Sequence, residues 1–158
     1  EHFNDTPTWQ SNLVRSGTQV SWTCRNLVDG KYKWRYRAVD EKGLASPWVE
    51  FRRAGNTDFI VDQTPPTVPG NLRVTGSTHA RIDLAWNPSM DNLSGVAYYR
   101  IYRDGQPIAT VPSTRTTFRD TNVRALRRYC YRVSAVDRAG NESAQSNEAC
   151  VRAVPWLR

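Results

Sequence analysis

One stretch of twelve residues occurs twice in this chain, and its spacing constrains the fold more than any other feature. Residues 32–43 read YKWRYRAVDEKG, and residues 129–140 read YCYRVSAVDRAG. The two stretches align without a gap at an offset of 97 residues, because 129 − 32 = 97. A period of about 100 residues is the length of one β-sandwich domain, and it is too long for a propeller blade or a solenoid turn. The chain is therefore predicted to contain two copies of one domain type.

The rest of the sequence is typical of an all-β protein. Apolar and polar residues alternate at period two in VRSGTQVSWTC (14–24), RIDLAW (81–86), YYRIYRDG (98–105) and RYCYRVSAV (128–136). Turn-forming stretches such as NPSMDNLSG and DRAGNES lie between them, and no segment has a helical apolar stripe. The proline-rich stretch VDQTPPTVPG, 61–70, reads as a stiff linker. Domains are therefore expected at 1–62 and 63–158.

Residues 66–153 resemble a fibronectin type III domain, of the kind found in bacterial secreted enzymes and surface proteins. PTVPGNLRV resembles strand A, RIDLAWNPS strand B, GVAYYRIYRDGQPIATV strands C and C′, TTFRDTNV strand E, and RYCYRVSAVDRAGNESAQSN strand F, its loop and the start of strand G. The resemblance implies a complete immunoglobulin-like β-sandwich of seven strands. Strand parity then predicts a core that contains Trp86, Tyr99, Ile101, Tyr129, Tyr131 and Val133.

Two of the three cysteines are predicted to form a disulfide bond. Parity places Cys130 on the outward face of strand F and Cys150 on the outward face of strand G. The hairpin between these strands turns at Gly140, since (130 + 150)/2 = 140, so the two cysteines face each other across neighbouring strands. Such a bond implies an oxidising compartment, and the protein is expected to be secreted or on a cell surface.

The first copy of the repeat comes too early for a full domain. If the second domain begins near residue 66, a first domain of equal length would begin near 66 − 97 = −31. Residues 1–62 then supply only the equivalents of strands C′, E, F and G, and the inward side chains of Tyr32 and Trp34 would form an exposed apolar patch. Three explanations stay open: the remainder of a longer chain completes the domain, another chain donates the missing strands, or a smaller domain closes on its own N-terminal residues. Under the first two, Cys24 has a partner outside the chain or is a spare thiol.

Charge is distributed unevenly and suggests two arginine-rich faces. The net charge is +7, and residues 63–158 carry 13 cations, all arginine, against 7 anions. The predicted faces group aromatic and basic side chains: Tyr98, Arg100, Tyr102, Arg132 and Arg152 in the second copy, and Arg35, Arg37 and Trp48 in the first. Such a face either stiffens the sheet or binds an acidic protein surface or an anionic glycan. Nucleic acid is not an expected partner, because no groove of stacking platforms is indicated.

Sites for metals and for catalysis are weakly indicated. Asp62, Asp137 and Asn141 offer oxygen ligands that suit calcium, although Asp and Asn in such loops more often cap turns. The two histidines, His2 and His79, have no carboxylate at a spacing that places a catalytic triad. No enzymatic activity and no other cofactor are expected within the chain. No run of 18 apolar residues is present, so no membrane span is predicted.

The predicted function is that of a non-catalytic extracellular spacer, adhesion or protein-interaction module within a larger secreted or surface protein. It includes the case of a structural subunit that is completed by the strands of another chain. The alternative is a pair of accessory domains in a secreted polysaccharide-degrading enzyme, in which an exposed tryptophan such as Trp9 or Trp48 contacts the polysaccharide.

Overall fold

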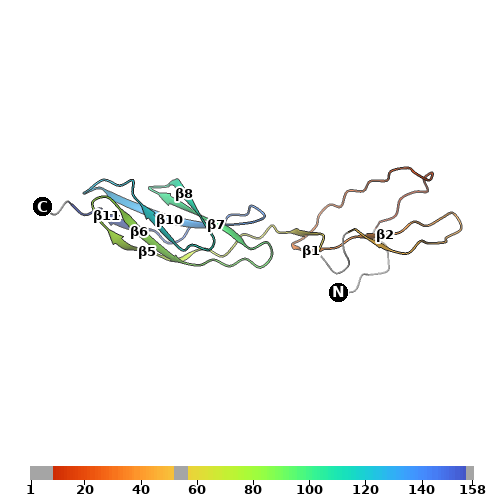
Figure 1. Cartoon of the computed structure of the whole chain (residues 1–158), viewed down its shortest axis with the longest axis horizontal. Helices are drawn as coiled ribbons and strands as arrows, with labels where there is room; N and C mark the ends of the chain where they lie inside the picture. The colour runs from red at the N-terminus through yellow and green to blue at the C-terminus, as the bar shows by residue number, and fades with distance from the viewer. Residues whose placement is uncertain (1–8, 52–56, 156–158) are drawn as a thin grey trace. The chain divides into compact units, whose positions relative to one another are not determined.

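The computed structural model shown in Figure 1 describes residues 9–51 and 57–155, and His2 lies outside the described residues. The chain divides into two compact units. The first consists of Glu1–Leu27 and Lys31–Phe59, and the second consists of Val28–Gly30 and Ile60–Arg158. None of the described residues forms a helix that is long and apolar enough to cross a membrane.

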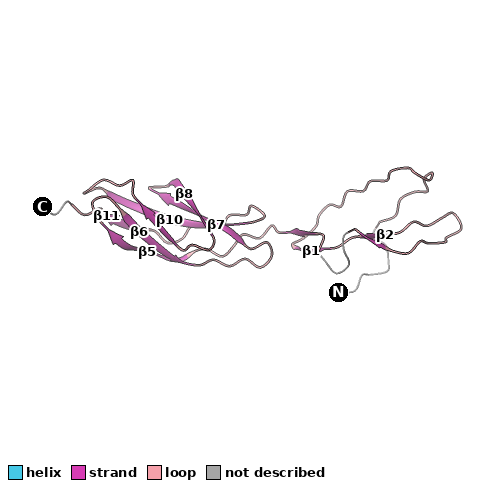
Figure 2. Cartoon of the chain, viewed as in Figure 1, coloured by secondary structure: helices cyan, strands magenta, loops and turns pink. Residues whose placement is uncertain are grey.

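The second unit is a sandwich of two antiparallel sheets, which Figure 2 shows in magenta. One sheet has the strand order β11-β10-β7-β8, and the other has the order β5-β6-β9. Their bounds are β5 Gly70–Ser77, β6 Ile82–Asn87, β7 Val96–Arg103, β8 Gln106–Pro112, β9 Thr117–Asp120, β10 Arg128–Asp137 and β11 Ala149–Arg152. These correspond in order to the expected strands A, B, C, C′, E, F and G, so the predicted all-β, immunoglobulin-like fold is confirmed.

Alternation along the strands builds the core between the two sheets. Tyr131 and Val133 of β10 have no exposed surface, whereas Arg132 between them is exposed. Trp86 of β6 meets Tyr99 of β7 edge to face, with 5.4 Å between the ring centroids. The structure places all six predicted core residues of this unit inside the core: Trp86, Tyr99, Ile101, Tyr129, Tyr131 and Val133.

Two tyrosine hydroxyl groups anchor the connection between β9 and β10. The backbone N–H of Arg124 donates to the hydroxyl of Tyr129 at 2.8 Å, which fixes the loop before β10 in the manner of a tyrosine corner. The buried hydroxyl of Tyr131 donates to the Asp120 carboxylate at 2.8 Å, and Arg103 forms an ion pair with the same carboxylate at 2.7 Å. Burial, and then the bond to Asp120, raises the pKa of Tyr131 far above its ordinary value. The phenol therefore remains a donor at any physiological pH.

The described residues from 9 to 61 form four short strands, of which β2 and β3 lie in the first unit and β1 and β4 each contain residues of both units. They are β1 Gly30–Tyr32, β2 Arg35–Tyr36, β3 Val49–Glu50 and β4 Phe59–Val61; β2 pairs with β3, and β1 pairs with β4. Residues 9–29 contain no strand, in contrast to the C′ and E strands expected there, because these residues have no neighbouring strand to pair with. Tyr32 and Trp34, the expected core residues, are only half-buried. None of the described residues of this unit is fully buried.

Candidate functional site

The outward face of the four-stranded sheet is organised around one carboxylate, that of Glu142. Tyr102 donates its hydroxyl to Glu142 at 2.7 Å, Ser134 donates its hydroxyl at 2.5 Å, and the guanidinium of Arg100 forms an ion pair with the same carboxylate. Strand register explains the gathering, since Ser134 lies opposite Arg100 in the pairing of β10 with β7. Burial would raise the pKa of Glu142, but the bonds from Ser134, Tyr102 and Arg100 outweigh it and lower that pKa. The carboxylate is therefore held ionised.

The other members of this predicted arginine face are also engaged. Arg132 forms an ion pair with Glu148 at 3.4 Å, and the guanidinium of Arg152 donates to the carbonyl oxygen of Leu126 at 3.1 Å. Arg100 also donates to the hydroxyl of Tyr98 at 3.3 Å. Sequence reasoning grouped the arginines of this face but assigned no acidic partner to Arg100 or Arg132. The paired charges favour a polar network that ties the strands together, and binding of an anionic partner here stays a prediction.

The basic residues of the first unit gather on one tryptophan. The guanidinium carbons of Arg35 and Arg37 lie 4.4 Å and 4.6 Å from the centroid of the Trp48 ring. The two arginines are two residues apart, so they project from the same side of the extended chain toward the neighbouring strand that follows Trp48. Cation–π contacts of this kind contribute about 0.5–1 kcal/mol each at exposed sites. Because cations cover Trp48, its ring offers less area for stacking on a sugar.

A cluster of three carboxylates joins loops at one end of the second unit. Oxygen atoms of Asp62, Asp91 and Asp137 all lie within 4.8 Å of one another. The predicted calcium ligands Asp62 and Asp137 are thus brought together, and Asp91, which sequence reasoning missed, is added. Asn141 donates its side-chain N–H to the Asp62 carbonyl oxygen at 3.0 Å and to the Asp137 carboxylate at 2.8 Å. It therefore presents a donor to this cluster and not the oxygen that a cation needs.

Backbone N–H groups already occupy much of this carboxylate surface. Asp137 accepts from the N–H of Gly140 and Asn141 at 2.7 Å and 2.8 Å, and Asp62 accepts from Ser94 at 3.0 Å. The Ser94 side chain, and then the backbone bonds, lower the pKa of Asp62 against the opposing effect of burial. The arrangement fastens three loops to one another. A bound calcium ion stays a prediction.

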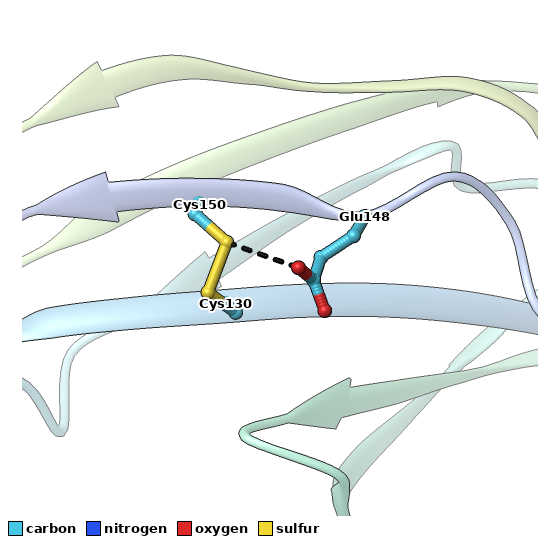
Figure 3. Close-up of side chains that lie close together, drawn as sticks. All are labelled: Cys130, Glu148 and Cys150. Atoms are coloured by element: carbon cyan, nitrogen blue, oxygen red, sulfur yellow. Dashed lines mark hydrogen bonds between the residues drawn. A yellow bond between two sulfur atoms is a disulfide. The ribbon is translucent and has the colours of Figure 1, made fainter.

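The disulfide bond between Cys130 and Cys150 is confirmed. The two residues are direct partners in the register of β10 with β11, and Figure 3 shows the bond that joins the strands. Oxygen Oε2 of Glu148 lies 3.4 Å from the Cys150 sulfur. A disulfide sulfur carries no proton, so this approach is a van der Waals contact and the trio is not a thiolate metal site. Cys24 is a free thiol.

His79 lies in the turn between β5 and β6, beside a shallow hollow that Arg81 and Arg119 also line. Arg81 and Arg119 both form ion pairs with Asp83, at 3.3 Å and 2.7 Å. The contacts described for the residues of this hollow do not include a carboxylate, a histidine and a nucleophile in the hydrogen-bonded arrangement of a triad.

The comparisons with known proteins agree with this sandwich. The sequence model "Fibronectin type III domain" matches residues 64–151. The chain belongs to the fibronectin type III family. Domains of this family are non-catalytic modules. The family match covers one domain, and the arrangement of two domains in tandem stays a prediction.

Curated relatives of this fibronectin type III chain are parts of longer bacterial proteins. Chitinase A1 of Niallia circulans is 41% identical over 135 residues, which is 85% of this chain and 19% of that protein. Alpha-amylase of Niallia circulans is 40% identical over 152 residues, which is 94% of this chain and 11% of that protein. The chain thus spans less than a fifth of the length of these relatives.

Solved structures agree with the fold. Chitinase ChiA74 from Bacillus thuringiensis superposes with a TM-score of 0.54 at 27% identity, over 63% of this chain and 15% of that chain. Domains A168–A170 of titin superpose with a TM-score of 0.52 at 18% identity, over 58% of this chain and 33% of that chain, which concerns the fold alone.

Proposed function

We propose that this chain is a non-catalytic accessory module of a larger secreted bacterial protein that degrades a polysaccharide. One observation carries the proposal: the similarity to a chitinase and to an alpha-amylase extends over 85% and 94% of the chain, and so includes both units. A third relative, Exoglucanase B of Cellulomonas fimi, is 33% identical over 84% of the chain and 12% of its own length. Similar sequence occurs in enzymes that act on different polysaccharides, and this favours a spacer over a binding site that is specific for one substrate.

The chemistry of the second unit supports a spacer role. The outward face of its four-stranded sheet is held together by internal ion pairs, and its core is filled by large side chains that include Trp86 and Tyr131. A rigid domain of this kind holds the segments on either side of it apart, while the linkers still allow relative motion. The disulfide between Cys130 and Cys150 supports an extracellular location, since such bonds persist in oxidising compartments.

The proposal is tested in the parent enzyme by deletion of the module. Replacing residues 1–158 with a glycine-serine linker of equal residue count keeps the connectivity and removes the rigid domain. We expect kcat/KM on a soluble oligosaccharide to be unchanged and hydrolysis of the insoluble polysaccharide to slow several-fold. The excised chain should hydrolyse neither substrate. Loss of activity on the soluble oligosaccharide after replacement, or hydrolysis by the chain itself, would contradict the proposal.

A further inference from the structure

The two copies of the repeated stretch form the same hairpin turn, and this fixes which positions are equivalent. Gly43 and Gly140 occupy the turn with φ values of 83° and 98°. The isolated bridge of Val39 with Ala45 matches, at the offset of 97, the bridge of Val136 with Glu142. Three further pairs of hydrogen bonds match at the same offset. Across the turn, Asp40 N donates to Leu44 O at 2.9 Å, as Asp137 N does to Asn141 O at 3.1 Å. Further from the turn, Ser46 N donates to Ala38 O and Ser143 N to Ala135 O, both at 2.9 Å, while Ala38 N donates to Ser46 Oγ at 3.0 Å and Ala135 N to Ser143 Oγ at 2.9 Å.

This equivalence gives Tyr32 and Trp34 the positions that Tyr129 and Tyr131 hold in the second unit. Tyr129 and Tyr131 retain 3% and 0% of their surface, because they lie in the core between the two sheets. Tyr32 and Trp34 are only half-buried. Two positions that are core in one copy are therefore incompletely covered in the other.

Tyr32 and Trp34 are partly covered, and the side chains that contact them here are aromatic rings. Trp22 meets Trp34 edge to face at 5.3 Å, and Phe59 stacks on both Trp34 and Tyr32 at 5.9 Å and 5.2 Å. Trp9 stacks on Trp22 at 5.7 Å, and these two rings expose 42% and 40% of their surface. We call these five residues, Trp9, Trp22, Tyr32, Trp34 and Phe59, the aromatic row. Partly exposed aromatic side chains that gather in this way are typical of an interaction surface.

The second unit shows what covers the same positions. There the sheet β5-β6-β9 packs over β10 and contributes Leu72, Leu84 and Trp86 to the shared core. Subtracting the offset from β5 to β7, residues 70–103, gives positions −27 to 6, ahead of the described residues. Residues 9–29 supply no strand in their place. The missing cover is therefore the counterpart of β5 and β6, and the counterpart of β7, which pairs with β10 in its own sheet, also falls ahead of residue 9.

We propose that the aromatic row is the core face of a second fibronectin type III-like sandwich, covered by strands of the same polypeptide that precede residue 9. The covering strand carries inward apolar side chains at alternate positions, as β6 does with Leu84 and Trp86. The matched relatives are several times longer than this chain, which leaves ample polypeptide for such strands. A second copy of the chain cannot take this role, because its own β5, β6 and β7 are committed to its second unit. The inference is independent of the accessory function proposed above.

Hydrogen exchange measured by mass spectrometry tests the inference on the whole chain. Residues 64–103 of this chain, which contain β5 to β7, are joined ahead of residue 7, since 103 − 97 = 6. The matched control carries Leu84→Asn and Trp86→Asn in the added copy only. We expect amide exchange in the 32–39 region to slow at least tenfold in the extended protein relative to chain 1–158. The control should exchange as fast as chain 1–158, and the peptides of β10 should be equally protected in all three proteins.

Each other outcome overturns the inference. Slow exchange of 32–39 already in chain 1–158 would mean that the aromatic row is a finished core. Equal slowing in the extended protein and in its control would mean that the added apolar side chains do not cover the row. Unchanged exchange in the extended protein would exclude strands of this pattern as the cover. Slow exchange that depends on the concentration of chain 1–158 would assign the row to self-association.

Discussion

Removal of the disulfide by the double substitution Cys130→Ala and Cys150→Ala is expected to destabilise the second unit strongly. The bond closes a loop with a sequence separation of 20 residues. In the chain-entropy treatment, a loop of this length lowers the entropy of the unfolded chain enough to contribute about 3 kcal/mol to stability. Both side chains lie on the outward face of β10 and β11, so truncation opens no cavity in the core. For a domain of about 100 residues, in which 1 kcal/mol corresponds to roughly 4–8 °C, the loss lowers the melting temperature by roughly 12–24 °C.

The measurement is urea and thermal denaturation followed by circular dichroism, with hydrogen exchange of β6 and β10 to assign the transition to the second unit. The matched control is Cys24→Ser, which removes the free thiol of the first unit and should leave that transition unchanged. A loss below about 1 kcal/mol in the double variant would refute the entropic reasoning for this loop. An equal loss in the control would show that thiol chemistry elsewhere in the chain had been measured instead.

Three further substitutions test the polar networks of the second unit. The hydrogen bonds and the ion pair from Ser134, Tyr102 and Arg100 lower the pKa of Glu142. The stability that they contribute is therefore fully present at a pH above the ordinary pKa of 4.5, and it is lost as the pH falls through the lowered pKa. Wild type should therefore lose about 1–2 kcal/mol relative to Glu142→Gln on acidification, and parallel pH profiles would contradict this. Tyr131→Phe leaves the buried Asp120 carboxylate short of one donor and should cost about 1–3 kcal/mol in urea denaturation, and a cost under about 0.5 kcal/mol would disagree. Asp137→Ala removes the acceptor for the N–H groups of residues 140 and 141. Amide hydrogen exchange in this loop should then rise about tenfold or more, a factor that corresponds to about 1.4 kcal/mol. Unchanged amide exchange would argue against the role of Asp137 in fastening the loop. Excess CaCl2 tests the calcium prediction, since a higher melting temperature in wild type but not in Asp137→Ala would support a bound ion and no change would contradict it.

The sandwich could be predicted from sequence because its signals are local and repeat along the chain. Alternation along residues 128–136 assigns Tyr131 and Val133 to one face and Cys130 to the other, and a hairpin centred on Gly140 places Cys130 opposite Cys150. Each of these inferences needs only the period of a strand and the position of a turn. The order of all seven strands of the second unit was implied by the resemblance to a fibronectin type III domain.

The partners of the charged side chains could not be predicted in the same way. Glu142 lies beyond the turn and reaches back across β10 to Arg100 and Tyr102 of β7, and this depends on the path of the loop. Asp91 joins Asp62 through the loop between β6 and β7, more than 25 residues away in sequence. In the first unit, the alternation within residues 14–24 indicated strands, but a strand forms only where a neighbour accepts its backbone hydrogen bonds.

The intact mass of the native polypeptide, followed by sequencing of its peptides, tests most directly the claim that this chain is a module of a larger polysaccharide-degrading protein. We expect a mass several times the 18.0 kDa of this chain, with peptides of a catalytic domain in the same polypeptide. A native mass of 18.0 kDa, with no peptides beyond the present sequence, would contradict it.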